Sequence, residues 1–195
     1  MHAFMEQVNG LLTPKELRGL AQAIEYIADL RKQRRFTMHL ELKGEGWWLS
    51  QKPSTTADVV LHVSDEIHVV DYKFGKIPVE VDANAQLMYY GLSFMPLAPK
   101  AKGVHVHIVQ PFADNIESVF IPKADLEKFR KESAAADAAI QAGSTTFGPT
   151  DKGCLFCPAN PHSRTDKATI MCPAMMSVLY PIKVDEDEIL DGLNN

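Results

Sequence analysis

The sequence predicts an α/β fold, with a central mixed sheet flanked by helices and a small cysteine-containing appendage at the C-terminal end. Helical and strand-like apolar periodicities alternate along the chain. Two strand-like runs, 57–63 and 66–73, are separated by only two residues and predict an antiparallel hairpin in the middle of the sheet. From residue 150 onward the chain holds all three cysteines, closely spaced with several prolines. We therefore expect a main domain over residues 1–149 and a cysteine-rich, metal-binding appendage with an acidic tail over 150–195.

The first predicted element is a helix over residues 13–35. Thr13 can cap its N-terminus, Pro14 suits the first turn, and Glu16 completes a capping box. Its apolar residues recur at helical spacing and form one stripe: Leu17, Leu20, Ala21, Ile24, Ile27 and Ala28.

A strand is expected next, over residues 36–42, because Met38, Leu40 and Leu42 alternate there with His39 and Glu41. The letters KGEG then predict a turn into the segment WWLSQ. The hairpin strands follow. The segment WWLSQ includes Trp47 and Trp48. We favour packing of their rings in the core or the hairpin, and stacking on the bases of a nucleic acid is the alternative.

The second half of the chain predicts a helix over about 81–95, which stops before Pro96. Two strands follow, at 103–110 and 117–122. A long helix over 123–142 ends at Gly143. The order of elements is therefore helix, three strands, helix, two strands, helix.

The acids in the hairpin are the first candidate functional residues. A turn at positions 64 and 65 places Asp58 directly opposite Asp71, so that their carboxylates share a face. Two carboxylates so close repel unless a cation lies between them, and carboxylate oxygens suit Mg²⁺ or Mn²⁺. Lys73 points to the same face as Asp71, and Glu41 on the preceding strand could complete the metal's ligands. The alternative is that these acids only keep an edge strand soluble.

A pair on the next helix fits the same site. Gln86 and Tyr90 are four residues apart, so that one helix face can present an amide and a phenol together. A buried tyrosine beside a surface glutamine is the alternative interpretation.

The motifs TADVV, DYK and QLMYY, in this order and spacing, resemble the PD-(D/E)XK nucleases, and most closely the RecB-like branch found in phage and CRISPR-associated nucleases. The resemblance covers residues 37–95. It implies that Asp58 and Asp71 bind the metal together with the backbone carbonyl of Tyr72. It further implies that Lys73 is the catalytic lysine. In the same way Gln86 and Tyr90 correspond to the QxxxY pair of that branch, and Glu41 to its upstream acid.

By this resemblance residues 1–149 are a nuclease domain, an N-terminal helix plus a catalytic core. The implied function is a Mg²⁺- or Mn²⁺-dependent deoxyribonuclease that hydrolyses phosphodiester bonds, a phage or prophage exonuclease of recombination or DNA processing. A structure-selective endonuclease is one alternative. A binding or interaction module that has lost the chemistry is the other. DNA is the expected partner, with a recombination protein as a further one.

The three cysteines form a second candidate metal site. Cys154 and Cys157 make a CxxC pair, followed by His162 and Cys172, and this set suits tetrahedral Zn²⁺. In RecB-like relatives cysteines of this region hold a [4Fe-4S] cluster, but here no cysteine precedes Cys154. Zinc is therefore favoured over iron–sulfur, and reduced thiols without metal are the third alternative. We interpret the remaining strand histidines as structural, except His39, which shares a face with Glu41; the structural ones are His62, His68, His105 and His107.

Charge and hydropathy limit the cellular location and the binding partners that can be expected for this protein. The net charge is −5, and five acids lie in the tail DEDEILDGLNN, so that the rest of the chain is neutral overall. Nucleic-acid contact must then come from local basic clusters such as RKQRR at 31–35, which could equally be a solvated helix end. No apolar run of transmembrane length and no export signal is present, so that we expect a cytoplasmic protein, in the host cytoplasm if phage-encoded, without membrane contact.

Overall fold

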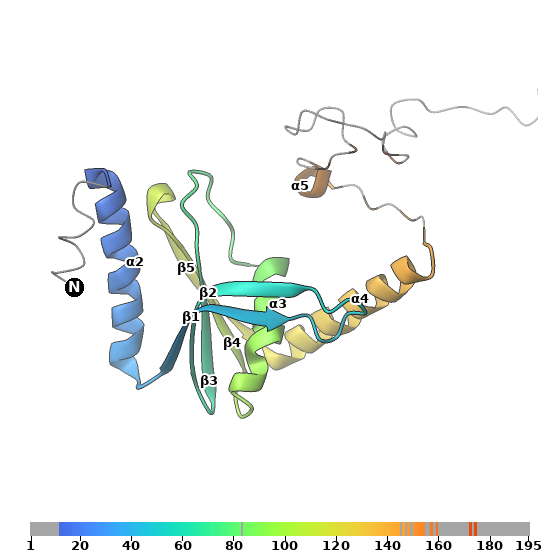
Figure 1. The fold of residues 1–195 in the computed structure, drawn as a ribbon, viewed down its shortest axis with the longest axis horizontal. Coiled ribbons are helices and arrows are strands. Elements are labelled where there is room, and N and C mark those ends of the chain that lie inside the picture. The colour runs from blue at the N-terminus through green and yellow to red at the C-terminus, as the bar shows by residue number, and fades with distance from the viewer. Residues whose placement is uncertain are drawn as a thin grey trace, which may run out of the picture. The chain divides into compact units, whose positions relative to one another are not determined.

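The computed structural model describes residues 12–82, 84–144, 146, 148, 150–154, 157, 159, 172 and 174. The chain divides into two compact units, Met1–Ala142 and Gly143–Asn195. The described part of the first unit is built on a five-stranded sheet with the strand order β1-β2-β3-β4-β5 (Figure 1). The expected mixed α/β sheet flanked by helices is therefore present.

The strands lie close to their predicted positions. They are β1 (Thr37–Glu45), β2 (Ser54–Val63), β3 (Glu66–Tyr72), β4 (Gly103–Gln110) and β5 (Asn115–Pro122). All neighbours are antiparallel except β3 and β4, which are parallel. A parallel pair needs a crossover, and helix α3 (Ala85–Phe94) lies within it.

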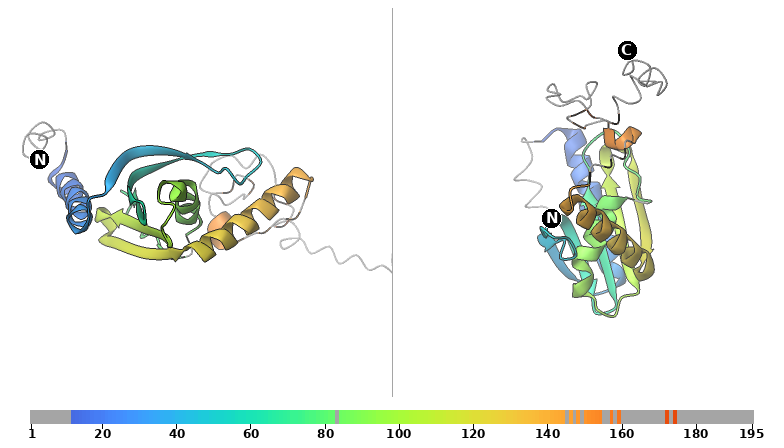
Figure 2. Two further views of the ribbon diagram at one scale, coloured as in Figure 1. Left: turned by 90° about the horizontal axis from the view of Figure 1, so that it is seen from below. Right: turned by 90° about the vertical axis from the view of Figure 1, so that its right-hand side faces the viewer.

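Helices cover both faces of the sheet (Figure 1, Figure 2). On one face, α3 and α4 (Lys123–Gln141) pack over the larger apolar core, to which they contribute Leu87, Tyr90 and Leu126. On the other face, α2 (Pro14–Gln33) packs Ala23, Ile27 and Leu30 against a smaller core. Two 3₁₀ turns complete this unit, Met95–Leu97 and Pro111–Ala113.

Helix α2 begins as the sequence predicts but buries a different line of residues. The Thr13 hydroxyl accepts from the Glu16 N–H and the Glu16 carboxylate accepts from the Thr13 N–H, so that the capping box is complete. However, most of the predicted apolar stripe is only partly buried. The fully buried residues are Gly19, Ala23, Ile27 and Leu30. The stripe faces both the sheet and an open groove between α2 and strands β1 to β3.

Strand β1 changes face at its middle. Leu40 pairs with Val59 and Leu42 pairs with Ala57, two positions further along the same ladder. Val59 packs in the α2-side core, whereas Ala57 packs in the α3-side core. Strict alternation would keep these two residues on one face. Glu41 lies between Leu40 and Leu42, and its φ of 48° is left-handed, so that the strand twists at this residue. The prediction that Met38, Leu40 and Leu42 share one face of the sheet is therefore wrong.

The turn after β1 comes later than predicted, because β1 continues through Glu45. The chain folds back over residues 46–52 and contacts α4 through Trp48 and Ser50. The Trp48 Nε1–H donates to Ser133 Oγ at 2.9 Å, and the Asp137 carboxylate accepts from the Ser50 N–H at 2.7 Å. Trp48 also packs against the larger core, as expected, whereas Trp47 is half exposed.

The second unit contains the short helix α5 (Asp151–Cys154) and the three cysteines. It begins at Gly143, whose φ of +83° follows the end of α4, where the sequence placed the helix stop. Across the stretches of chain that the structure describes, no helix is both long and apolar enough to span a membrane.

Candidate active site

The predicted hairpin register is confirmed. The ladder between β2 and β3 pairs Val63 with Glu66 and continues to Val59 with Val70. The next position along this register would oppose Asp58 to Asp71, and the ladder ends just before it. Instead, the Asp58 carboxylate accepts a hydrogen bond from the Tyr72 N–H at 2.6 Å. Asp58 and Asp71 therefore flank the point where β2 and β3 separate.

Asp71 is the buried acid of the site. It lies at the end of β3 on the face covered by α3, and only 4% of its surface is exposed. Burial raises the pKa of its carboxyl above the ordinary value; Lys73 opposes this shift, and the charge of Asp58 adds to it. Lys73 Nζ lies 2.8 Å from Asp71 Oδ2, yet this oxygen accepts no hydrogen bond of good geometry. A buried carboxylate oxygen with unused acceptor capacity is suited to a bound cation.

Lys73 connects Asp71 to helix α3. Its ammonium donates to Gln86 Oε1 at 3.3 Å, and the Gln86 amide donates to Tyr90 Oη at 2.7 Å. The predicted i, i+4 pair therefore shares one helix face. The helix start fixes this geometry, because the Asn84 side chain caps it by accepting from the Gln86 and Leu87 N–H groups. Four sequence-predicted residues thus form one continuous polar chain from strand to helix.

The two remaining predicted ligands open toward the α2 side of the sheet, whereas Asp71 lies on the α3 side, so that the expected shared face of Asp58 and Asp71 is not observed. Glu41 and Asp58 line a groove of about 660 Å³ between α2 and strands β1 to β3. The same register row places Glu41 next to Asp58, since Leu40 pairs with Val59 and Leu42 with Ala57. Within the described residues, the oxygens of Glu41, Asp58 and Asp71 do not come within 4.8 Å of one another as a set. The structure brings together Asp71, Lys73, Gln86 and Tyr90, with Asp58 beside them, and leaves Glu41 at the groove.

Tyr72 points away from Asp71, as strand alternation requires. Its ring packs in the α2-side core, and its hydroxyl reaches the Ala23 carbonyl at 3.4 Å. Burial raises the pKa of Tyr72 to about 12, with Asp58 adding to the shift, so that the phenol stays neutral. Of Tyr72, only the backbone carbonyl is therefore available as a metal ligand.

The cysteine site is described only in part. The Cys157 N–H donates to the Cys154 carbonyl, and the Cys172 N–H donates to the Ala159 carbonyl, both at 3.2 Å. His162, the predicted fourth ligand, lies outside the described residues. Among the residues that are described, the three thiols do not form a set of ligand atoms within 4.8 Å of one another.

The structure also assembles a cluster of possible metal ligands that includes His68 and His105, two histidines that the sequence pattern indicated to be structural. Glu66, His68 and His105 each offer a ligand atom within 4.8 Å of the other two. The motifs E-x-H at 66–68 and H-x-H at 105–107 were the available signal, because alternate strand residues share a face. Their meeting depends on the parallel pairing of β3 with β4, which local spacing does not show.

Comparison with known proteins gives two results. A family model described as "Protein of unknown function (DUF2800)" matches residues 22–195. A solved structure titled "Crystal structure of SSO0001" is similar to this chain with a TM-score of 0.41 and 16% sequence identity, over 78% of this chain and 70% of that chain. This structural similarity is too low to define fold or function.

Proposed function

We propose that this chain, which belongs to the DUF2800 family of proteins of unknown function, is a metal-dependent deoxyribonuclease. The proposal depends above all on one observation. Asp71, Lys73, Gln86 and Tyr90 form a continuous polar chain beside Asp58, at the edge where the parallel strands β3 and β4 end. Isolated ion pairs between an acid and a lysine are common in proteins. A lysine held between a buried carboxylate and an amide on a helix is, in contrast, positioned for chemistry.

The acids fit a divalent cation. Asp71 Oδ2 is buried and faces only the Lys73 ammonium at 2.8 Å, without a hydrogen bond of good geometry. Burial raises the pKa of this carboxyl, and the charge of Asp58 raises it further. Asp58, Asp71 and the Tyr72 carbonyl would hold Mg²⁺ or Mn²⁺, and Glu41 would join them from β1. Such an ion lowers the pKa of a bound water and neutralises charge on a phosphate.

The chain's own residues supply the rest. Lys73 lies 28% exposed at the mouth of the site, where its ammonium can orient a water or stabilise negative charge on a phosphate. Gln86 holds this ammonium through its carbonyl oxygen. Tyr90 accepts from the amide and so fixes which end of Gln86 faces Lys73.

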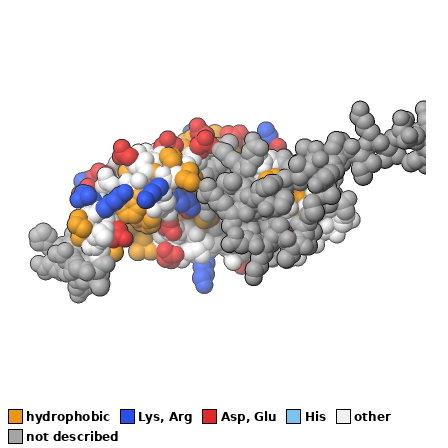
Figure 3. Space-filling view, turned by 90° about the horizontal axis from the view of Figure 1, so that it is seen from above, with side chains coloured by type: hydrophobic (Ala, Val, Ile, Leu, Met, Phe, Trp, Pro, Cys, Tyr) orange, Lys and Arg blue, Asp and Glu red, His pale blue; other side chains and the backbone are white. Residues whose placement is uncertain are grey.

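The groove supports a DNA strand as substrate. Leu40 and Phe74 line it although 65% and 52% of their surfaces are exposed, and Arg31 adds a cation to its wall. Exposed apolar and aromatic side chains next to carboxylates suit unstacked bases whose phosphate enters the metal site. Figure 3 shows Lys and Arg side chains beside hydrophobic ones on the face toward which the β3–α3 loop projects. We therefore propose that a DNA strand with unpaired bases occupies the groove.

The test is DNA cleavage by the full chain, with end-labelled linear and circular DNA, single- and double-stranded, with and without Mg²⁺ or Mn²⁺. We expect metal-dependent cleavage that Lys73→Ala reduces by about 100-fold or more, the usual result of removing a charge-stabilising group. Asp71→Asn should have a similar effect. Lys128→Ala, which removes an exposed lysine from α4, outside the groove, is the matched control and should cleave like wild type.

Cleavage of circular DNA would identify an endonuclease, and cleavage of linear DNA alone an exonuclease. DNA binding without cleavage by the wild type would indicate an inactive binding module and contradict the proposal. Undiminished cleavage by a folded Lys73→Ala variant would contradict it as well.

A further inference from the structure

A second polar cluster lies at the other end of strands β3 and β4. Glu66 and His68 alternate on β3, and His105 and His107 alternate on β4. His68 pairs with His105 in the parallel register, and their rings stack with centroids 4.6 Å apart. Glu66 is five strand positions from Asp71, about 16 Å along β3, so that this cluster is separate from the candidate active site.

We propose that Glu66, His68 and His105 bind a first-row transition-metal ion, and that Zn²⁺ matches the ligands best. The three ligand atoms already lie within 4.8 Å of one another. Imidazole nitrogens with one carboxylate oxygen form a common ligand set for zinc. Tetrahedral zinc separates its ligand atoms by about 3.4 Å. The distance of 2.9 Å between Glu66 Oε1 and His68 Nε2 must therefore lengthen by about 0.5 Å, and the longer separations must shorten by at most about 1.4 Å.

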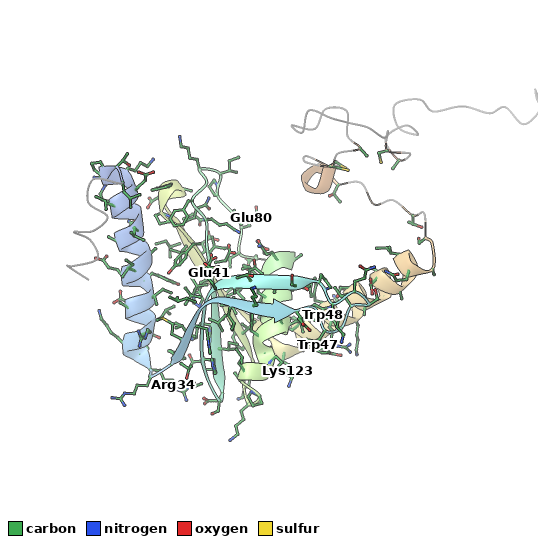
Figure 4. The ribbon with its side chains drawn as sticks, viewed as in Figure 1. Arg34, Glu41, Trp47, Trp48, Glu80 and Lys123 are labelled. Atoms are coloured by element: carbon green, nitrogen blue, oxygen red, sulfur yellow. The ribbon has the colours of Figure 1, made fainter. Side chains whose placement is uncertain are left out.

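Hydrogen bonds behind the ligands are those of a supported metal site. His68 Nδ1 lies 2.9 Å from His107 Nε2, and His107 Nδ1 lies 2.8 Å from Tyr26 Oη. On the other side, Arg34 donates to Glu66 Oε2 at 2.7 Å and leaves Oε1 facing His68. Histidine ligands of metals usually donate their second N–H to such a partner, and ligand carboxylates are themselves hydrogen-bonded. Arg34 marks this site in Figure 4, at the end of α2, away from Glu41 on β1.

Solvent reaches the site from one side. Glu66 and His105 line an open hollow of about 350 Å³ together with Lys100 and Lys102. Three protein ligands leave one position for water or an exogenous ligand. Three cations line the hollow, Arg34, Lys100 and Lys102, against two acids, Asp65 and Glu66. The excess positive charge makes the carboxylate of Glu66 necessary for holding a dication, and the open position favours an anion such as hydroxide or inorganic phosphate.

Metal binding should reverse the direction of the hydrogen bonds that join His68, His107 and Tyr26. Without metal, His68 Nε2 must carry a proton, because the Glu66 carboxylate 2.9 Å away can only accept a hydrogen bond. With both imidazoles neutral, His107 Nε2–H then donates to His68 Nδ1. A metal on His68 Nε2 displaces the proton of that nitrogen, so that neutral His68 carries its proton on Nδ1 and donates to His107 Nε2. His107 in turn gives up its Nε2 proton and carries one on Nδ1, which then donates to Tyr26 Oη. The tautomer of His68 therefore reports occupancy.

Zinc binding by the full chain tests the proposal, with Zn²⁺ alone as the probe and calorimetric titration after metal removal as the measurement. Wild type is expected to bind one equivalent more than His105→Ala, and Glu66→Gln to bind at this site about tenfold more weakly or worse. Any zinc at the cysteines contributes equally to each variant. His62→Gln is the control, because His62 contacts His39 at 3.0 Å in a separate pair. Circular dichroism and thermal melting check that each variant is folded.

Equal zinc stoichiometry and affinity in wild type and folded His105→Ala would overturn the proposal, and a loss confined to His62→Gln would move the site elsewhere. In ¹⁵N-labelled wild type, Zn²⁺ should shift the imidazole proton of His68 from Nε2 to Nδ1, and an unchanged tautomer would also contradict it. Mg²⁺-dependent cleavage of DNA by His105→Ala should remain like wild type, so that failure here leaves the nuclease proposal standing.

Discussion

Glu41 combines an unfavourable backbone conformation with a place at the candidate site. Its φ of 48° lies in the left-handed region, which costs a residue with a Cβ about 1 to 2 kcal/mol. It lies in the row where β1 and β2 change face, and its side chain lines the groove beside Asp58. Strain that persists within a strand often accompanies function, because the surrounding structure must hold it in place.

We therefore expect Glu41→Gly to separate stability from activity. Glycine tolerates this φ, so the substitution should raise the free energy of unfolding, by up to about 1 kcal/mol. If Glu41 is a ligand of the catalytic metal, the same variant should lose most of its metal-dependent cleavage. Denaturant unfolding and DNA cleavage measure the two effects.

Lys52 provides the matched control. Its φ is 44°, but it lies in the turn after β1, away from the groove. Lys52→Gly should gain comparable stability and keep full activity. If both variants cleave DNA equally well, Glu41 has no part in the site.

At the scale of elements, the crossover helix α3 determines whether the site forms. It carries Gln86 and Tyr90, and it approaches the sheet closely at Gly91. A Cβ at this position would lie 2.7 Å from Val104 Cγ1 and 3.1 Å from Leu126 Cδ2. Both neighbours are buried, on β4 and α4 respectively, and have little freedom to move. The absence of a side chain at residue 91 thus sets the distance between helix and sheet.

Gly91→Ala is accordingly expected to destabilise the protein. Overpacking costs about 1 to 3 kcal/mol, and the better helix propensity of alanine returns about 1 kcal/mol, so that a net loss of about 1 kcal/mol is expected. The thermal midpoint measures it. Gly75→Ala is the control, because the nearest atom to its added Cβ is Gln110 Nε2 at 3.9 Å. A Gly91→Ala midpoint equal to that of Gly75→Ala would show that α3 can shift without cost.

At the scale of the whole molecule, the chain joins a sheet-based unit to a cysteine-containing unit. Residues 143–195 form a unit small enough that a hydrophobic core of its own would be marginal, so that a metal bound there would supply much of the free energy that orders it. Thiolates select zinc or iron over Mg²⁺, so that a metal centre at the cysteines would be chemically distinct from the proposed carboxylate site.

Elemental analysis of anaerobically purified protein tests the cysteine centre. We expect about one zinc per chain held at Cys154, Cys157, His162 and Cys172, or iron with visible absorbance if a [4Fe-4S] cluster forms. Cys157→Ser should lose this metal, whereas His105→Ala should lose only the zinc proposed at Glu66 and His68. Metal content that is identical in wild type and Cys157→Ser would leave the thiols without a metal role.

The sequence by itself determined the elements of this protein and the register of its central hairpin. The capping box of α2, the start of β4 and the pairing of Val63 with Glu66 follow from local rules of capping, alternation and turn length, so that they could be read without coordinates. The grouping of Lys73 with Gln86 and Tyr90 was predictable for a similar reason. A strand end and the helix after it are close in the chain, and i, i+4 spacing fixes the helix face.

Only the tertiary structure decided the rest. The face switch at Glu41 depends on one left-handed residue that strand periodicity cannot reveal. The opening of Glu41 and Asp58 into a groove depends on where α2 packs. The meeting of Glu66 and His68 with His105 depends on the parallel pairing of two strands about 40 residues apart in the chain. Local sequence specifies short-range geometry, whereas contacts between distant segments are set by the packing of the whole core.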